Sequence, residues 1–187
     1  MKRLAGSLLI IAACLVWLGI GSAGAQYERL HEFGAGNDGA YPYGALTLRG
    51  SSIYGMTSEG GTSGNGTLFS IKTDGSDYSL IRSFGGGASD GATPMGAVTI
   101  VGYLLSGTSY YGMSAAGGAS NAGTIFKRHV PSILGGITTY TLLHSFDGGA
   151  GGDYPLGDLL LSGSTGSCWP TATCMAPPPT AASMVMA

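Results

Sequence analysis

The sequence predicts an all-β protein built from tandem four-stranded antiparallel repeats, which form a partial β-propeller of about two and a half blades. Three observations support this fold class. Glycine makes up 35 of the 187 residues, which disfavours helices because each glycine in a helix interior costs about 1 kcal/mol relative to alanine. A strand-like motif occurs three times, and one longer stretch matches a later stretch without a gap, at an offset of 57 residues.

Residues 1–25 are expected to be a signal peptide. Two basic residues precede an apolar run, Leu4–Ile20, and the small residues Ala23 and Ala25 form a signal-peptidase site. Two alternatives stay open: the apolar run is nearly long enough for a membrane anchor, and Cys14 ends a stretch that is similar to a bacterial lipobox. The protein is therefore predicted to be exported to the periplasm, the cell surface or the medium.

The chain that follows the leader is acidic and sparsely charged. Without residues 1–25 it has six Lys or Arg residues against ten Asp or Glu residues, a net charge of −4. Its one pair of adjacent basic residues is Lys127 and Arg128, so it lacks the basic patch that a nucleic-acid partner requires. Membrane attachment is expected only through the leader or through a C-terminal anchor beyond this sequence.

The first repeat covers residues 26–77 and contains four strand-like runs separated by turns that contain glycine. The runs are Tyr27–Phe33, Ala45–Arg49, Ser52–Thr57 and Gly66–Thr73. Asn65-Gly66 and Asp74-Gly75 are favourable turn dipeptides because these residues accept a positive φ at low cost. The four runs are expected to pair as one antiparallel sheet.

The second repeat covers residues 78–139. Its stretch Tyr110–Arg128 aligns without a gap with Ile53–Ile71, and the two share YGM, GG and GT followed by an apolar residue and Phe. In its first run, Tyr78–Phe84, the even-numbered residues are expected on one face and the odd-numbered residues on the other. A period of two is typical of a strand.

A partial third repeat covers residues 140–167. It begins with YTLLHSF at Tyr140, which corresponds to YERLHEF at Tyr27 and YSLIRSF at Tyr78, and each copy is followed by a proline block. A ring of this kind ordinarily needs about four to eight blades. Further blades or self-association are therefore expected to complete the fold, because an isolated repeat leaves its apolar face in water.

Taken together, the motifs LHSF, DGAxPxGxL and YGMTSxGGxxGxGTLFxI resemble the GloVer-type tandem repeat of exported bacterial proteins that carry varied C-terminal anchors, a choice-of-anchor arrangement. The similar region runs from about Tyr27 to Gly163. The resemblance implies a β-propeller-like surface protein. It implies no catalytic residue that can be assigned to a position of this chain.

Residues 168–187 are expected to be an aberrant tail produced by a frameshift between about Leu161 and Cys168. In the shifted register, permitted codons give LANGNLYGTTTYGGKHGDG, a close variant of the YGMTSEGG segment that the third repeat lacks. The alternative is a native, unstructured tail rich in proline and alanine. In an exported chain Cys168 and Cys174 are able to form a disulfide, but a frameshift would make both residues accidental.

The histidines are expected to have structural roles. His31 and His144 occupy the same repeat position, at which the second repeat has Arg82. This pattern indicates a polar slot on a strand face rather than a set of metal ligands. His129 is placed in an insertion and has no partner in the sequence.

The acidic residues also favour structural interpretations. Asp38, Asp90 and Asp147 each precede a glycine, as turn residues do. Calcium is the alternative, but a calcium site takes about six to eight oxygen ligands. Glu28 and Glu32 would share one face of a strand, yet neither recurs in the other repeats.

Tyr54 and Tyr111 are equivalent positions that either belong to the core or line a sugar-stacking groove. The sequence otherwise identifies no catalytic residue, no cofactor site and no metal site.

The predicted function is that of an exported cell-surface or secreted repeat protein. It would act as a binding or structural module rather than an enzyme, with an extracellular glycan or protein as its ligand. The alternative is a fragment of a propeller-fold enzyme acting on extracellular polysaccharide, with its catalytic residues in missing blades. A further alternative is that the chain does not fold stably alone.

Overall fold

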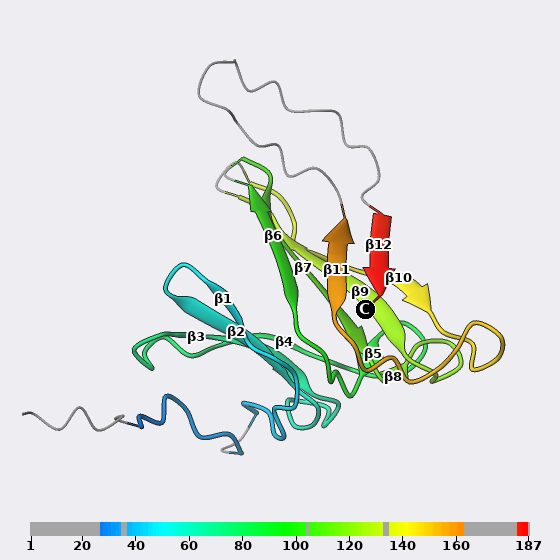
Figure 1. The fold of residues 1–187 in the computed structure, drawn as a ribbon, viewed down its shortest axis with the longest axis horizontal. Coiled ribbons are helices and arrows are strands. Elements are labelled where there is room, and N and C mark those ends of the chain that lie inside the picture. Colours follow the sequence, from blue (N-terminus) through cyan, green and yellow to red (C-terminus); the bar gives the residue numbers. More distant parts are fainter. Residues whose placement is uncertain (1–26, 35–36, 104, 133–134, 163–182, 187) are drawn as a thin grey trace, which may run out of the picture.

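The computed structural model describes residues 27–34, 37–103, 105–132, 135–162 and 183–186. Within these ranges the fold is all-β, with two four-stranded antiparallel sheets and two shorter sheets (Figure 1). The predicted fold class is confirmed, and the arrangement is consistent with part of a β-propeller. None of the described residues forms a helix long and apolar enough to cross a membrane. The predicted signal peptide, Cys168 and Cys174 lie outside the described residues.

The first four-stranded sheet, called blade 1, comes mainly from the first repeat. Its strands are β1 (Thr47–Arg49), β2 (Ser52–Thr57), β3 (Thr67–Lys72) and β4 (Ser79–Ser83), and they lie in this order across the sheet. Thr57 pairs with Thr67 and Ser52 with Lys72, so β2 and β3 align over their full lengths.

The second four-stranded sheet, called blade 2, repeats this order. Its strands are β6 (Thr99–Tyr103), β7 (Gly107–Ser114), β9 (Thr124–Val130) and β10 (Thr139–Ser145). Two short sheets lie beside it: β5 (Gly91–Ala92) pairs with β8 (Ala116–Gly117), and β11 (Leu159–Ser162) pairs with β12 (Ser183–Met186). β11 belongs to the third repeat and lies against β6 and β7.

The outer strand of each blade comes from the start of the next repeat. Tyr78–Phe84 contributes β4 to blade 1, and Tyr140–Phe146 contributes β10 to blade 2. The prediction that Tyr27–Phe33 is a strand is wrong, because no strand forms there. The fourth strand of blade 1 is instead β4, which pairs with the edge of β3.

The expected alternation within Tyr78–Phe84 is also wrong. Leu80 pairs with Phe69 and Arg82 pairs with Leu68, so Ile81 is an extra residue that forms a β-bulge. A bulge sends the residues on either side of it to opposite faces of the sheet. Blade 2 has the same irregularity between Leu142 and His144.

The two blades pack face to face around one apolar core. The front face of each blade is defined here as the one that carries Phe69 or Phe126, and the back face as the one that carries Met56 or Met113. The core joins the back of blade 1 to the front of blade 2 and consists of Met56, Leu68, Phe84, Val98, Tyr110 and Phe126. The rings of Phe84 and Phe126 lie 5.1 Å apart in an edge-to-face contact.

A pair of buried hydroxyl groups joins the two middle strands of each blade. Thr57 and Thr67 share a hydrogen bond of 2.7 Å in blade 1, and Ser114 and Thr124 share one of 2.7 Å in blade 2. All four side chains are buried. Each hydroxyl therefore has its partner inside the blade, as buried polar groups require.

The innermost strands of successive repeats approach through backbone and hydroxyl contacts. The Thr47 hydroxyl donates to the carbonyl of Val98 at 2.6 Å, and the Thr99 hydroxyl donates to the carbonyl of Leu159 at 2.5 Å. Beside them, a Cβ on Gly44 would collide with the backbone of Gly96, and one on Gly96 with that of Gly157. Only glycine fits this approach.

Candidate functional site

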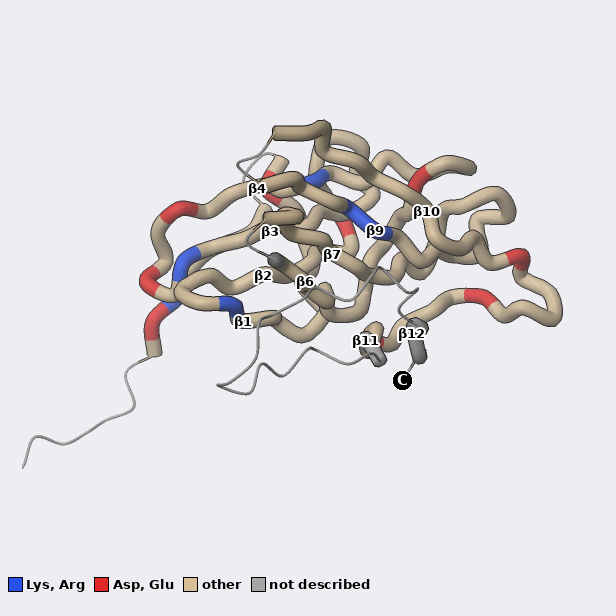
Figure 2. The backbone as a smooth tube through the Cα atoms, turned by 90° about the horizontal axis from the view of Figure 1, so that it is seen from above, with Lys and Arg blue, Asp and Glu red and all other residues tan. Residues whose placement is uncertain are grey.

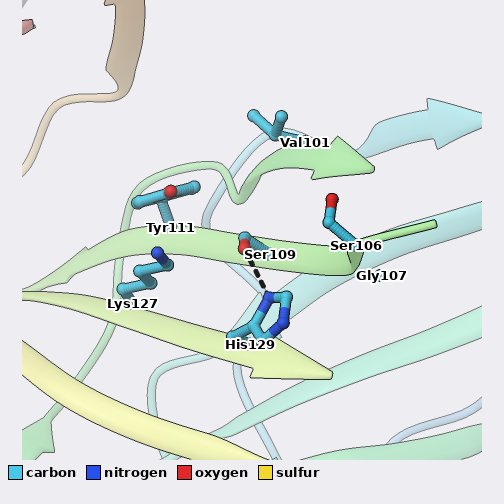
Figure 3. A pocket seen from close by; sticks show the side chains of 7 residues that line it. All are labelled: Val101, Ser106, Gly107, Ser109, Tyr111, Lys127 and His129. Carbon is cyan, nitrogen blue, oxygen red and sulfur yellow. Dashed lines mark hydrogen bonds between the residues drawn. The ribbon is translucent and has the colours of Figure 1, made fainter. Parts of the chain in front are cut away.

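The back face of blade 2 carries an open pocket of about 350 Å³ (Figure 3). Its walls come from β6, β7, the turn between them, and β9. The lining residues are Val101, Ser106, Gly107, Ser109, Tyr111, Lys127 and His129.

The polar groups of this pocket are placed by the register of β7 and β9. Ser109 lies opposite His129, and Tyr111 lies opposite Lys127. The Ser109 hydroxyl and His129 Nδ1 are 2.9 Å apart, and Lys127 Nζ is 5.6 Å from the centre of the Tyr111 ring. The expectation that His129 lies in an insertion without a partner is therefore wrong.

The contact between Ser109 and His129 has the residue types of a nucleophile and its base. Within the part of the chain that the structure describes, no Asp or Glu carboxylate hydrogen-bonds to His129. The pair thus lacks the orienting acid of a catalytic triad. As opposite residues of two paired strands, Ser109 and His129 form an ordinary cross-strand pair.

A second pocket, of about 320 Å³, opens on the front face of blade 1. One side is formed by the N-terminal segment, Tyr27–Phe33, and the other by Leu46, Ile53, Phe69 and Ile71. Phe33 contacts the Phe69 ring at 4.9 Å. Both pockets therefore lie on the two blade faces that do not pack against each other.

The repeat position of His31, Arg82 and His144 forms a polar slot in the first two cases. Arg82 lies between the Asp90 carboxylate, at 2.7 Å, and the ring of Tyr140, whose centre is 3.4 Å from the guanidinium carbon. His31 is 3.1 Å from Asp38. His144 is exposed and touches Phe146.

The N-terminal segment therefore contacts the front of blade 1 in the same way as β4 and Phe84, the residue that follows β4, contact blade 2. The His31 ring stacks on Tyr78 at 4.1 Å, as Arg82 stacks on Tyr140, and Phe33 contacts Phe69, as Phe84 contacts Phe126. The segment has the place of an outer strand, although it is not paired into a sheet.

Burial affects the two tyrosines under these outer segments. It raises the pKa of Tyr78 to about 12, with a smaller contribution from the Asp38 carboxylate. It also raises the pKa of Tyr140, with the Asp90 carboxylate again adding to the effect. The Tyr78 hydroxyl donates to the Asp38 carbonyl at 2.6 Å. These groups stay neutral and structural at ordinary pH.

A comparison with protein families identifies the repeat. The model of the Gloeobacter/Verrucomicrobia repeat matches residues 18–174. The chain belongs to the Gloeobacter/Verrucomicrobia repeat family. The resemblance inferred from the sequence motifs is confirmed at the level of the repeat. Searches of curated proteins and of solved structures found no match.

The remaining sequence candidates of this Gloeobacter/Verrucomicrobia repeat are dispersed. Tyr54 is half-buried between the blades, 5.8 Å from the Tyr110 ring, whereas its equivalent Tyr111 lines the open pocket. Asp147 accepts a hydrogen bond from the Gly149 amide in a turn. Glu32 pairs with Arg29 at the surface.

Among the described residues, no three His, Cys, Asp or Glu side chains gather in a way that could hold a metal ion. Sequence reasoning missed Ser109, Lys127 and His129 as pocket residues. The signal that finds them is the offset of 57 residues, since it places Ser109 and His129 on the positions of Ser52 and Lys72, which pair across β2 and β3.

Proposed function

We propose that this Gloeobacter/Verrucomicrobia repeat protein is an exported binding or structural module, and that its binding surfaces are the two open blade faces. The observation that carries this proposal is the difference between equivalent side chains. Val98 on the front of blade 2 is 1% exposed, whereas its equivalent Leu46 on the front of blade 1 is 60% exposed. A face built for packing is left in contact with water.

The chemistry of the open faces favours a polypeptide partner. The front of blade 1 presents the apolar side chains of Leu46, which is 60% exposed, and Ile53, which is half-buried. Burial of such surface gains about 25 cal/mol per Å². Figure 2 shows that charged residues are few and dispersed along the described chain, so the partner is not selected by a strong field.

Export is supported by the leader, with its basic start, apolar run and small residues at positions 23 and 25. The test is expression of the whole gene in a bacterial host, followed by fractionation and N-terminal sequencing. The expected result is a protein outside the cytoplasm that begins at Gln26. Full retention in the cytoplasm with Met1 intact would contradict this part of the proposal.

A glycan is the second candidate ligand, and one observation favours it. The rings of Tyr41 and Tyr43 are both exposed, lie 6.4 Å apart and are inclined by only 12°. Parallel aromatic faces are able to stack on the apolar faces of sugar rings, while the hydroxyls hydrogen-bond.

Glycan-array binding that is lost in Tyr43→Ala and kept in Tyr154→Ala would support this candidate, because Tyr154 is also exposed but lines neither pocket. The same samples distinguish binding from catalysis on polysaccharide. Binding without release of reducing sugar is the expected result. Sugar release that depends on the protein would replace the binding module by the enzyme alternative.

A further inference from the structure

We propose that a second copy of this chain covers the open faces: the front of blade 1 in one copy stacks on the back of blade 2 in another. The inference rests on the proposed function, since it names the partner of the same two faces. The contact between the copies would repeat the contact that already joins blade 1 to blade 2 within one chain.

The contact within one chain supplies the template. Its back side presents Met56, whose methyl group would lie 3.3 Å from a Cβ on Gly112. It also presents Tyr54, whose ring is 5.8 Å from that of Tyr110. Thr47 adds the hydrogen bond to the next repeat. Each of these residues has an equivalent on the outward faces.

The back of blade 2 is equivalent to the back of blade 1, which forms one side of this template. Tyr111 stands for Tyr54 and Met113 for Met56, both at the offset of 57 residues. Tyr111 lines the open pocket. The back of blade 2 therefore carries the same residue types that the back of blade 1 uses to contact the next blade.

The front of blade 1 is equivalent to the front of blade 2, which forms the other side of the template. Phe69 stands for Phe126 and Ile53 for Tyr110, again at an offset of 57 residues. Gly55 stands for Gly112, and a Cβ on either residue would collide with the phenylalanine ring of its own blade. The two outward faces are thus complementary by construction, and each has its pocket where the partner's side chains would enter.

The third repeat shows how the copies would join. Leu159 is buried against blade 2, and its backbone accepts the Thr99 hydroxyl, in the same way as Val98 accepts Thr47. A second copy would therefore place Tyr27–Arg49 where this copy has Tyr140–Ser162. The two segments carry the same motif, YxxLHxF followed by a proline block. Exchange of equivalent segments between copies is the basis of domain swapping.

Two differences bear on the exchange. Tyr27–Phe33 docks through its side chains but forms no strand, so pairing with β9 would give it backbone hydrogen bonds in exchange for those that β10 makes with β9. Tyr27–Arg49 is also continuous with a four-stranded blade, whereas the described part of the third repeat offers only the two-stranded sheet of β11 and β12. The complete blade covers more of the apolar face.

The symmetry of this contact limits the size of the assembly. Front-to-back contacts are heterologous, and they close into a ring when the rotation between copies permits. The described residues of each copy form two four-stranded blades. A ring of about four to eight blades would therefore contain about two to four copies.

The first test is light scattering on the purified chain. We expect an assembly of about two to four copies, and we expect Leu46→Asp to convert it to a monomer, because a charge would be buried between copies. The matched control is Leu105→Asp: Leu105 is 69% exposed, in the turn between β6 and β7, and lines neither pocket. A monomeric parent protein, or a Leu46→Asp variant that stays assembled, would overturn the inference.

The second test reads the register and does not depend on a destabilising substitution. Tyr111 is replaced by the photo-crosslinker p-benzoylphenylalanine, and isotopically labelled and unlabelled copies are mixed. Because Tyr54 contacts Tyr110 within one chain, the expected crosslink joins position 111 to the peptide that contains Ile53 of another copy. A crosslink only to Leu159–Ser162 of the same copy would contradict the proposal.

The two proposals fail separately. A monomer that is exported and binds glycans or another protein would refute only the stacking of copies. An assembled ring that is retained in the cytoplasm would refute only the exported module. Far-ultraviolet circular dichroism of Leu46→Asp distinguishes loss of assembly from loss of fold, because a folded monomer keeps the β spectrum of the parent.

Discussion

Blade 1 and blade 2 have the same interior but different surroundings. The hydroxyl pair between their middle strands has the same length, 2.7 Å, in both. Their front faces differ, because blade 2 is covered by a complete blade and blade 1 only by the N-terminal segment. The comparison teaches that a single repeat satisfies its own polar groups, whereas its apolar face depends on a neighbour.

The largest expected effect separates the two equivalent phenylalanines. Phe126→Ala removes a side chain enclosed by both blades and should lower the free energy of unfolding by about 3–5 kcal/mol. Phe69→Ala should cost about 1–2 kcal/mol less, because the N-terminal segment beside it is free to close the cavity. Urea denaturation measures both. Equal losses would show that the N-terminal segment covers blade 1 as firmly as a blade does.

The next effect concerns the glycine contact between the blades. Gly44→Ala should lower the free energy of unfolding by about 1–3 kcal/mol, because its Cβ collides with the backbone of Gly96. Gly149→Ala is the matched control, since its nearest neighbour lies at 3.6 Å. Thermal melting compares the two variants. A melting temperature as high as that of the control would mean that the innermost strands can separate without loss.

An effect of similar size is expected at the polar slot. Arg82→Ala should destabilise the protein by about 1.5–3 kcal/mol, because it removes a charge-assisted hydrogen bond from Asp90 and the guanidinium from the Tyr140 ring. His31→Ala should cost about 1 kcal/mol, the value of one ordinary hydrogen bond. Chemical denaturation of both variants checks the order. A larger loss for His31→Ala would show that the N-terminal segment contributes more to stability than the Arg82 contacts do.

The smallest effect is expected from alkaline pH. The pKa of Tyr78 is raised above its ordinary value of about 10 to about 12, so its contribution to stability is complete below pH 10 and is lost as the pH rises to about 12. Tyr140 should lose its contribution in the same direction. Absorbance titration near 295 nm should show a late-ionising class that shrinks in Tyr78→Phe. Ionisation of every tyrosine near pH 10 would exclude burial of these hydroxyls.

Much of the fold was predictable because the repeat carries local information. Glycine-containing turns fixed the ends of β2 and β3, and the observed bounds differ from the expected runs by at most a residue at either end. The polar slot was predictable because His31 and Arg82 share one repeat position. The turn residues lie next to the strand ends that they fix, and the slot follows from comparing equivalent repeat positions.

The rest depended on which strands become neighbours. The pattern of Tyr27–Phe33 is that of a strand, but a strand also needs a free edge, and local sequence does not say which sheet supplies it. The pocket was missed for a related reason: Ser109 and His129 are 20 residues apart and meet only through the register of two strands. The bulge at Ile81 is likewise set by pairing.

Because β4 is encoded at the start of the second repeat, the repeat boundary is a poor place to cut the chain. A fragment that stops at Asp77 would leave β3 as a bare edge, which invites aggregation through edge-to-edge pairing. A fragment extended through Phe84 keeps all four strands together. Proteolytic nicks and expression boundaries for single blades therefore belong in the glycine loop after Phe84, seven residues beyond the point that repeat counting suggests.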